Sequence, residues 1–139
     1  AVISGAKTFT LLPPTDVAFL PEKSFPTRRY RAIDSSNPFE LMLTQDECPT
    51  ESLTWIPLDP DDSEVCEKYP SFSNTHPIRC TVYPGEVLYI PALWYHRVSQ
   101  LLPTVAVNFW YDQRFDYRFV FYSTVQQLVR DKENEIEGI

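Results

Sequence analysis

The stretch GEVLYIPALWYHRVSQ, residues 85–100, is the part of this sequence that most clearly indicates a fold. It contains two runs rich in β-branched and aromatic residues, separated by Pro91, and such runs are typical of strands. A similar run precedes it, so IRCTVYPGEVLYI (78–90) predicts two strands joined by a Pro-Gly turn. The second run begins with His96, one of only two histidines in the chain.

The pattern extends in both directions. Residues 96–102 and 104–111 predict a further strand pair around a turn near Pro103. From 116 to about 131 the apolar period changes from 2 to 3.6, which predicts a helix. Asp116 is its expected N-cap, and one face holds Phe121, Val125, Leu128 and Val129.

The N-terminal half gives weaker signals. AVIS and KTFTLL predict two strands around a tight turn at Gly5, where glycine tolerates a positive φ. Residues 22–54 predict a long excursion in which only 39–43 is a strand. A short helix is expected to begin with Asp59 as N-cap and Pro60 at its first position, and to end at Pro70.

Short strands and closing turns together predict a mainly β chain, either a barrel or a sandwich. We favour a double-stranded β-helix barrel of the cupin (jelly-roll) type. A single domain is expected over 1–139, with barrel strands over about 1–112 and a C-terminal helix over about 116–131.

Composition narrows the possible functions of the chain. The 139 residues carry a net charge of -7, which disfavours binding to nucleic acid or an anionic membrane. Arg28, Arg29 and Arg31 form a basic cluster too short to indicate phosphate binding, and the carboxylates at 59–67 predict a solvated surface. The three cysteines, Cys48, Cys66 and Cys80, show no C-x-x-C spacing, which favours a reducing compartment.

Three places in the sequence could carry chemistry. Ala106, Asn108 and Trp110 share one face of the strand expected at 104–111, which is either a cavity wall or a half-exposed surface. His96 is either a packed strand residue or a metal ligand, and one histidine cannot hold a metal alone. Lys7 shares a face with Phe9 and Leu11, so either that face is outward or the ammonium meets a carboxylate.

Several motifs resemble a known family. LYIPALWYHRV, VNFWYD and the aromatic-rich helix after them resemble the C-terminal part of a jumonji-C (JmjC) domain, and VISGAKTFTLLPPTD and WIPLDPD strengthen the likeness. The resemblance implies an oxygenase that uses Fe(II) and 2-oxoglutarate. His96 matches the distal iron ligand, Lys7 the lysine that binds 2-oxoglutarate, and Asn108 the pocket amide, with Trp110 on the same face; no catalytic residue beyond the metal ligand is implied.

The H-x-D pair that supplies the family's other two iron ligands is absent from this sequence. In the family it precedes the lysine matched by Lys7, so we expect these ligands to lie upstream of Ala1 and the barrel to be N-terminally incomplete. The chain alone is then expected to be inactive, with an open sheet edge and exposed apolar surface. A non-catalytic cupin-like binding or scaffold module is the alternative.

The resemblance also implies partners for the complete protein. Its branch of small hydroxylases predicts lysyl hydroxylation of a protein substrate, with GTP-binding proteins as the expected targets. We further expect a homodimer through the C-terminal helix, a cytoplasmic location that can extend to the nucleus, and no nucleic acid or membrane partner.

Overall fold

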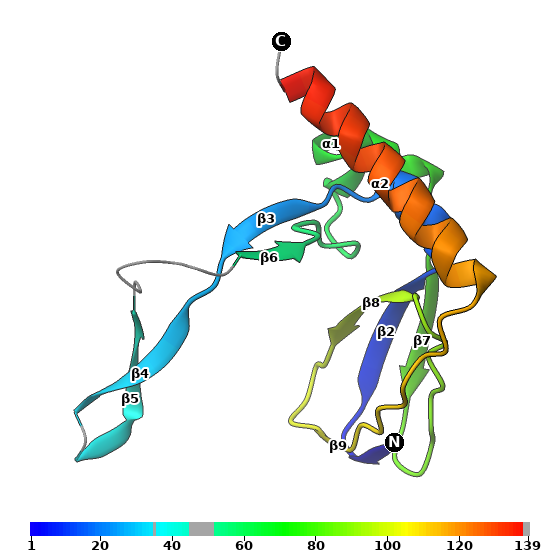
Figure 1. Cartoon of the computed structure of the whole chain (residues 1–139). Helices are drawn as coiled ribbons and strands as arrows, with labels where there is room; N and C mark the ends of the chain where they lie inside the picture. The colour runs from blue at the N-terminus through cyan, green and yellow to red at the C-terminus, as the bar shows by residue number, and fades with distance from the viewer. Residues whose placement is uncertain (35, 45–51, 138–139) are drawn as a thin grey trace. The chain divides into compact units, whose positions relative to one another are not determined.

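The computed structural model describes residues 1–34, 36–44 and 52–137. They form two compact units, Ala1–Pro21 with Leu58–Ile139 and Glu22–Pro57 (Figure 1). The prediction of a single domain stays a prediction, because two compact units can belong to one domain. The first unit contains Lys7, His96 and the C-terminal helix.

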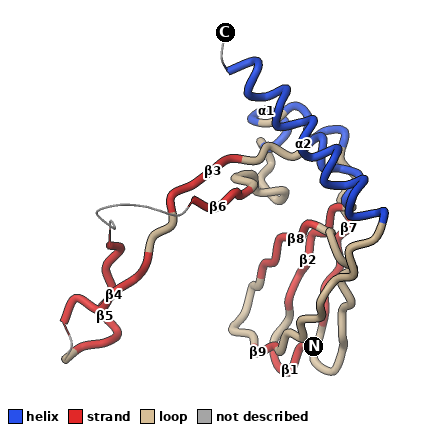
Figure 2. Tube along the Cα trace, in the orientation of Figure 1, coloured by secondary structure: helices blue, strands red, loops and turns tan. Residues whose placement is uncertain are grey.

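The first unit is built on a three-stranded antiparallel sheet. Strand β2 (Lys7–Leu12) lies in its centre, between β7 (Ile78–Val82) and β8 (Tyr95–Ser99). A second, two-stranded sheet pairs β1 (Val2–Ser4) with β9 (Val105–Ala106) (Figure 2). The strands predicted at 78–82 and from about residue 96 are therefore confirmed, and the described strands form small sheets without a closed barrel.

The bend at Gly5 separates these two sheets. β1 and β2 form on either side of it as predicted, but the prediction that they pair with each other is wrong, because each pairs with strands much later in the chain. Gly5 has φ of 79°, and a Cβ there would lie 2.5 Å from Thr104 Oγ1. Glycine therefore allows both the turn and the close approach of Thr104, whose hydroxyl oxygen accepts a hydrogen bond from the Ala6 backbone N–H at 3.3 Å.

Two predicted strands are shorter or absent. Residues 86–94 have no regular structure, and 104–111 contains only the two residues of β9. Val87 and Tyr89 are 73% and 78% exposed. The alternating pattern is present, but beyond one bond from the Val2 N–H to the Glu86 carbonyl, no described strand forms a ladder with 86–94, and a strand needs partners for its backbone groups.

Helical segments make up the rest of the first unit. The 3₁₀ segment η1 (Pro14–Phe19) and helix α1 (Val65–Lys68) are followed by a second 3₁₀ segment, η2 (Pro70–Asn74), and by helix α2 (Tyr117–Glu137). α2 packs on η1, as Figure 1 shows. The buried apolar residues of this unit come from both sheets and from these segments: Val2, Leu11, Leu12, Val17, Leu20, Val65, Phe72 and Val82.

Helix α1 starts later than predicted. The Asp59 carboxylate accepts the backbone N–H of Asp61 at 3.0 Å, but no helix begins at Pro60, because turns follow up to Glu64. The helix begins at Val65 and ends before Pro70, as the prediction placed its end. Asp and Asn side chains favour both caps and turns, which is why the sequence did not distinguish them.

Helix α2 confirms the predicted C-terminal helix. The Asp116 carboxylate accepts the Arg118 backbone N–H at 2.9 Å, as an N-cap does. The predicted apolar face is divided, since Val125 and Val129 are half-buried while Phe121 and Leu128 are 71% and 61% exposed. Among the described residues, no helix has both the length and the apolar character that crossing a bilayer requires.

The second unit consists of two-stranded ribbons. β3 (Lys23–Pro26) pairs with β6 (Ser52–Trp55), and β4 (Arg29–Asp34) pairs with β5 (Asn37–Thr44). The strand predicted at 39–43 lies within β5 and is confirmed, whereas the expectation of little other regular structure was wrong. Its strand side chains are exposed wherever their burial is described, which explains the weak periodicity: neither face of such a ribbon must be apolar.

Candidate functional site

Lys7 and His96 lie on the same face of the three-stranded sheet. His96 is the register partner of Leu11, and directly opposed residues of an antiparallel pair point to the same side. Lys7 shares that side with Leu11 because side chains alternate along β2. Four residues of strand and one strand spacing place the two Cα atoms roughly 14 Å apart.

We call this surface the Lys7–His96 face, and it is otherwise mostly apolar. Leu11 and Val82 are buried, Val98 and Ile78 are 40% and 52% exposed, and Phe9 and Cys80 are half-buried. Lys7 is half-buried and His96 is exposed. The expectation of exposed apolar surface is met on this face, although patches of this kind also mark binding surfaces.

Lys7 has no carboxylate of this chain as a partner within the described residues. A half-buried ammonium on an apolar face is poorly solvated, and a bound anion would compensate for this. Lys7 is thus neither fully outward nor paired with a carboxylate among the described residues, and its role stays a prediction.

Asn108 and Trp110 are not brought onto this face by a strand ladder. The ladder considered between 96–102 and 104–111 does not form, because β8 pairs with β2 and β9 pairs with β1. Both residues are exposed, Trp110 by 83%, in the irregular segment before α2. Val107 bonds to Ala1 through both backbone groups, at 2.9 Å each, and this fixes where the segment leaves the sheet.

Metal-ligating side chains do not gather in the described part of the chain, where no three His, Cys, Asp or Glu residues could hold an ion together. His76, expected in a surface loop, has a 77% exposed side chain but is anchored to Asp16 of η1. Cys66 and Cys80 are free thiols, and Cys48 lies outside the described residues.

The opposite face of the sheet carries a charged network that the sequence did not reveal. Thr10 on β2 is 1% exposed, and its register partners are Arg79 on β7 and Arg97 on β8. All three side chains reach Asp61: Thr10 Oγ1 at 3.2 Å, Arg79 at 3.1 Å and Arg97 at 2.8 Å. The acidic segment at 59–67 is thus partly fastened to the sheet through Asp61, which is nevertheless exposed, in keeping with the predicted solvated surface.

The remaining acids of this segment interact locally. A hydrogen bond from Lys68 holds the pKa of Asp62 below its usual range, and the pKa of Lys68 is raised in turn. The two atoms Lys68 Nζ and Asp62 Oδ2 are 2.8 Å apart at the surface. This pair contributes little to stability in solvent.

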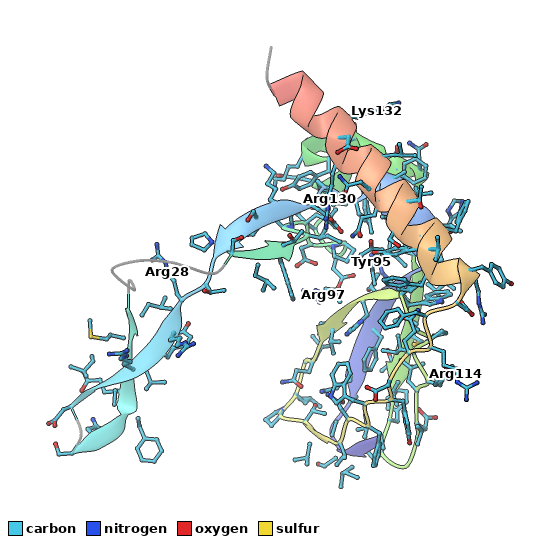
Figure 3. The ribbon with its side chains drawn as sticks, viewed as in Figure 1. Arg28, Tyr95, Arg97, Arg114, Arg130 and Lys132 are labelled. Atoms are coloured by element: carbon cyan, nitrogen blue, oxygen red, sulfur yellow. The ribbon has the colours of Figure 1, made fainter. Side chains whose placement is uncertain are left out.

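Strand β8 is also tied to helix α2. Tyr95 and Tyr122 share a hydrogen bond between their hydroxyls at 2.6 Å, and Gln126 Nε2 donates to the Tyr122 hydroxyl at 3.3 Å. Figure 3 shows Tyr95 and Arg97 on β8, at the end of the sheet nearest to α2. Alternation places both on the face opposite His96.

A family model described as a cupin-like domain matches residues 1–117. The chain belongs to the cupin-like domain family. The predicted mainly β, cupin-type fold class is thereby confirmed, with the C-terminal helix that the structure adds to it. The described strands form small sheets, of which β7-β2-β8 carries Lys7 and His96.

Curated relatives confirm the jumonji-C resemblance. The chain is 38% identical over 129 residues to the human "Bifunctional peptidase and (3S)-lysyl hydroxylase JMJD7". It is 38% identical over 139 residues to the "Lysine-specific demethylase JMJ32" of Arabidopsis thaliana, and 33% identical over 142 residues to "JmjC domain-containing protein E" of Dictyostelium discoideum. Each match covers 93% of this chain but only 39–40% of the relative, so the chain spans about two fifths of these proteins.

Proposed function

We propose that this chain supplies the cosubstrate-binding and distal-histidine part of an Fe(II)- and 2-oxoglutarate-dependent protein hydroxylase. The observation that supports it is the Lys7–His96 face, where an ammonium without a carboxylate partner among the described residues and an exposed imidazole lie on one apolar surface. The jumonji-C relatives support the same chemistry. When bound, iron supplies the oxidising chemistry, for which 2-oxoglutarate is the cosubstrate.

Each residue has a distinct role in this proposal. Lys7 would bind the far carboxylate of 2-oxoglutarate, and His96 would be one iron ligand through its imidazole. Val82, the buried register partner of Lys7, would help to exclude water from the space beside the ammonium, and a low local dielectric strengthens the ammonium–carboxylate pair. Asn108 and Trp110, in the irregular segment that follows β9, would contact the bound cosubstrate.

A lysine side chain in a protein is the proposed target. The printed names of the human and Arabidopsis relatives both refer to lysine, in one case as a lysyl hydroxylase and in the other as a lysine-specific demethylase. We propose hydroxylation rather than demethylation, with GTP-binding proteins as the substrates, on the strength of the resemblance to the lysyl hydroxylase.

The chain by itself is proposed to be inactive. One imidazole cannot hold Fe(II) in a facial arrangement of three protein ligands, and the sequence contains no H-x-D triplet. A chimaera in which the human relative's preceding segment is joined to Ala1 would supply the missing ligands. We expect the chimaera to convert 2-oxoglutarate and the chain alone to convert none.

Two substitutions in the chimaera separate the proposed roles. His96→Ala should abolish turnover, whereas Lys7→Ala should raise the KM for 2-oxoglutarate at least a hundredfold, because losing a poorly solvated ion pair costs about 3–5 kcal/mol. Lys68→Ala, which removes an exposed lysine, is the matched control and should leave both parameters unchanged. An unchanged KM in Lys7→Ala would remove the anchor role. An inactive chimaera that still folds would favour the non-catalytic binding module.

A further inference from the structure

We infer that Tyr95 and Arg97 are positioning residues that hold His96 from the opposite face of the sheet. The inference rests on the proposed function, in which His96 must be presented to a metal. The two residues flank His96 directly in sequence, and alternation sends their side chains to the other side of β8. Each is fastened there to a different part of the first unit.

The Arg97 anchor uses both ends of its guanidinium group. One terminal nitrogen lies 2.9 Å from Asp59 Oδ2 and the other 2.8 Å from Asp61 Oδ2. Asp61 is held in turn by Thr10 on β2 and Arg79 on β7. A single carboxylate therefore joins all three strands in one register row, the row next to the one that contains His96.

The Tyr95 anchor reaches a different element. Its hydroxyl lies 2.6 Å from that of Tyr122, and the two rings pack with their centroids 6.4 Å apart. Tyr122 also accepts a hydrogen bond from Gln126 one turn later along α2. Helix α2 and the acidic loop thus hold the residues on either side of His96.

An edge strand needs such anchors more than a central one. Among the described strands, β8 has only β2 as a hydrogen-bonded neighbour, so its other backbone groups provide no restraint. Ligand imidazoles must be placed accurately, because small displacements of a reacting or binding group cost large factors in rate or affinity. Restraining residues 95 and 97 restrains the backbone from which the imidazole projects, while leaving its own face open for a ligand.

The chain contains only two histidines, which allows a direct test by NMR on the complete chain. The imidazole signals of His96 report the anchored strand, and those of His76, held by Asp16, serve as an internal reference. In Arg97→Gln and in Tyr122→Phe, we expect the His96 signals to broaden or split and its amide exchange to rise about fivefold to tenfold, while His76 stays unchanged.

Matched variants separate positioning from general destabilisation. Arg97→Lys keeps the charge, so its His96 signals should change less than those of Arg97→Gln. Asp61→Asn should resemble Arg97→Gln. Asp62→Asn, one residue away, alters local bonds with Glu64 and Lys68 and should leave His96 unchanged. Equal changes at both histidines, or unchanged His96 signals in Arg97→Gln and Tyr122→Phe, would overturn the inference.

A second measurement distinguishes failure of the anchors from failure of the proposed function. In the active chimaera, Arg97→Gln should lower kcat at least tenfold with little change in the KM for 2-oxoglutarate, because Lys7 lies at the far end of β2. The NMR experiment uses no iron. If His96→Ala keeps full turnover while the NMR effects occur, the anchors exist but the iron-ligand role is wrong. Loss of kcat without any NMR effect would refute the anchors.

Discussion

Outside the candidate site, we predict that the Asp16 carboxylate makes a large contribution to the stability of the first unit. It is 1% exposed and accepts two hydrogen bonds from His76, from the backbone N–H at 2.7 Å and the ring Nδ1 at 3.1 Å. These bonds tie η1 to the residues just before β7. We expect Asp16→Ala to destabilise the first unit substantially, and His76→Ala to do so only slightly.

The magnitudes follow from the surroundings of the two groups. A hydrogen bond from a backbone N–H to a buried carboxylate is worth about 1.5–3 kcal/mol, and its loss leaves the N–H without a partner. The His76 side chain is 77% exposed, so its ring contributes about 0–1 kcal/mol. Asp16→Ala should therefore lower the free energy of unfolding by about 3 kcal/mol, and His76→Ala by less than about 1 kcal/mol.

Urea denaturation followed by tryptophan fluorescence measures the difference. With a slope near 2 kcal/mol per molar urea, Asp16→Ala should shift the midpoint down by roughly 1.5 M. Asp62→Ala is the matched control, because its carboxylate bonds to Glu64 and Lys68 nearby, and its midpoint should stay close to that of the parent. If His76→Ala shifted the midpoint as far as Asp16→Ala, the ring and not the backbone would be the main partner, and the reasoning would be refuted.

Three further predictions concern glycine, pH and association. Gly5→Ala should lower the free energy of unfolding, measured by urea denaturation, by at least about 2 kcal/mol, because the new Cβ clashes with Thr104 and the backbone is left-handed. Gly85→Ala should lower it by only about 1 kcal/mol, because Gly85 has φ 87° but open space around it. The Arg118 side chain holds the pKa of Asp116 below its usual range. The Asp116 carboxylate therefore stabilises the α2 N-terminus above about pH 4, and this stabilisation should be lost as the pH falls below that. Amide exchange at Arg118 should show the loss, and Asp116→Asn should remove the pH dependence. We also propose that α2 mediates a homodimer through its exposed stripe, so Phe121→Glu with Leu128→Glu should give monomers in sedimentation analysis, and a parent chain that is already monomeric would contradict it.

The sequence predicted elements more reliably than their pairing. α2 could be placed because its period and its Asp116 cap are both local signals. β1 and β2 were predicted as strands, but the local pattern does not specify partners that lie much later in the chain. The run at 86–90 shows the converse, a strand pattern that joins no sheet in the described part of the chain, although the Val2 N–H bonds to the Glu86 carbonyl.

The candidate site was predictable only in part. A resemblance singled out Lys7 and His96, and the sheet register then placed them on one face, which alternation alone could not do for residues on different strands. The anchors behind His96 gave no local signal, because the Arg97 partners are about forty residues earlier and the Tyr95 partner lies on a helix.

The central place of β2 in its sheet has a consequence for how the chain folds. β2 occupies residues 7–12, yet its two neighbours are residues 78–82 and 95–99, so it must wait for nearly a hundred residues to emerge during synthesis. The β4–β5 ribbon pairs residues a few positions apart and can form much sooner. Closing such long loops is slow and entropically costly, so we expect formation of the first unit to be the late, rate-limiting step of folding. Until then, the apolar side chains of β2 remain available to chaperones.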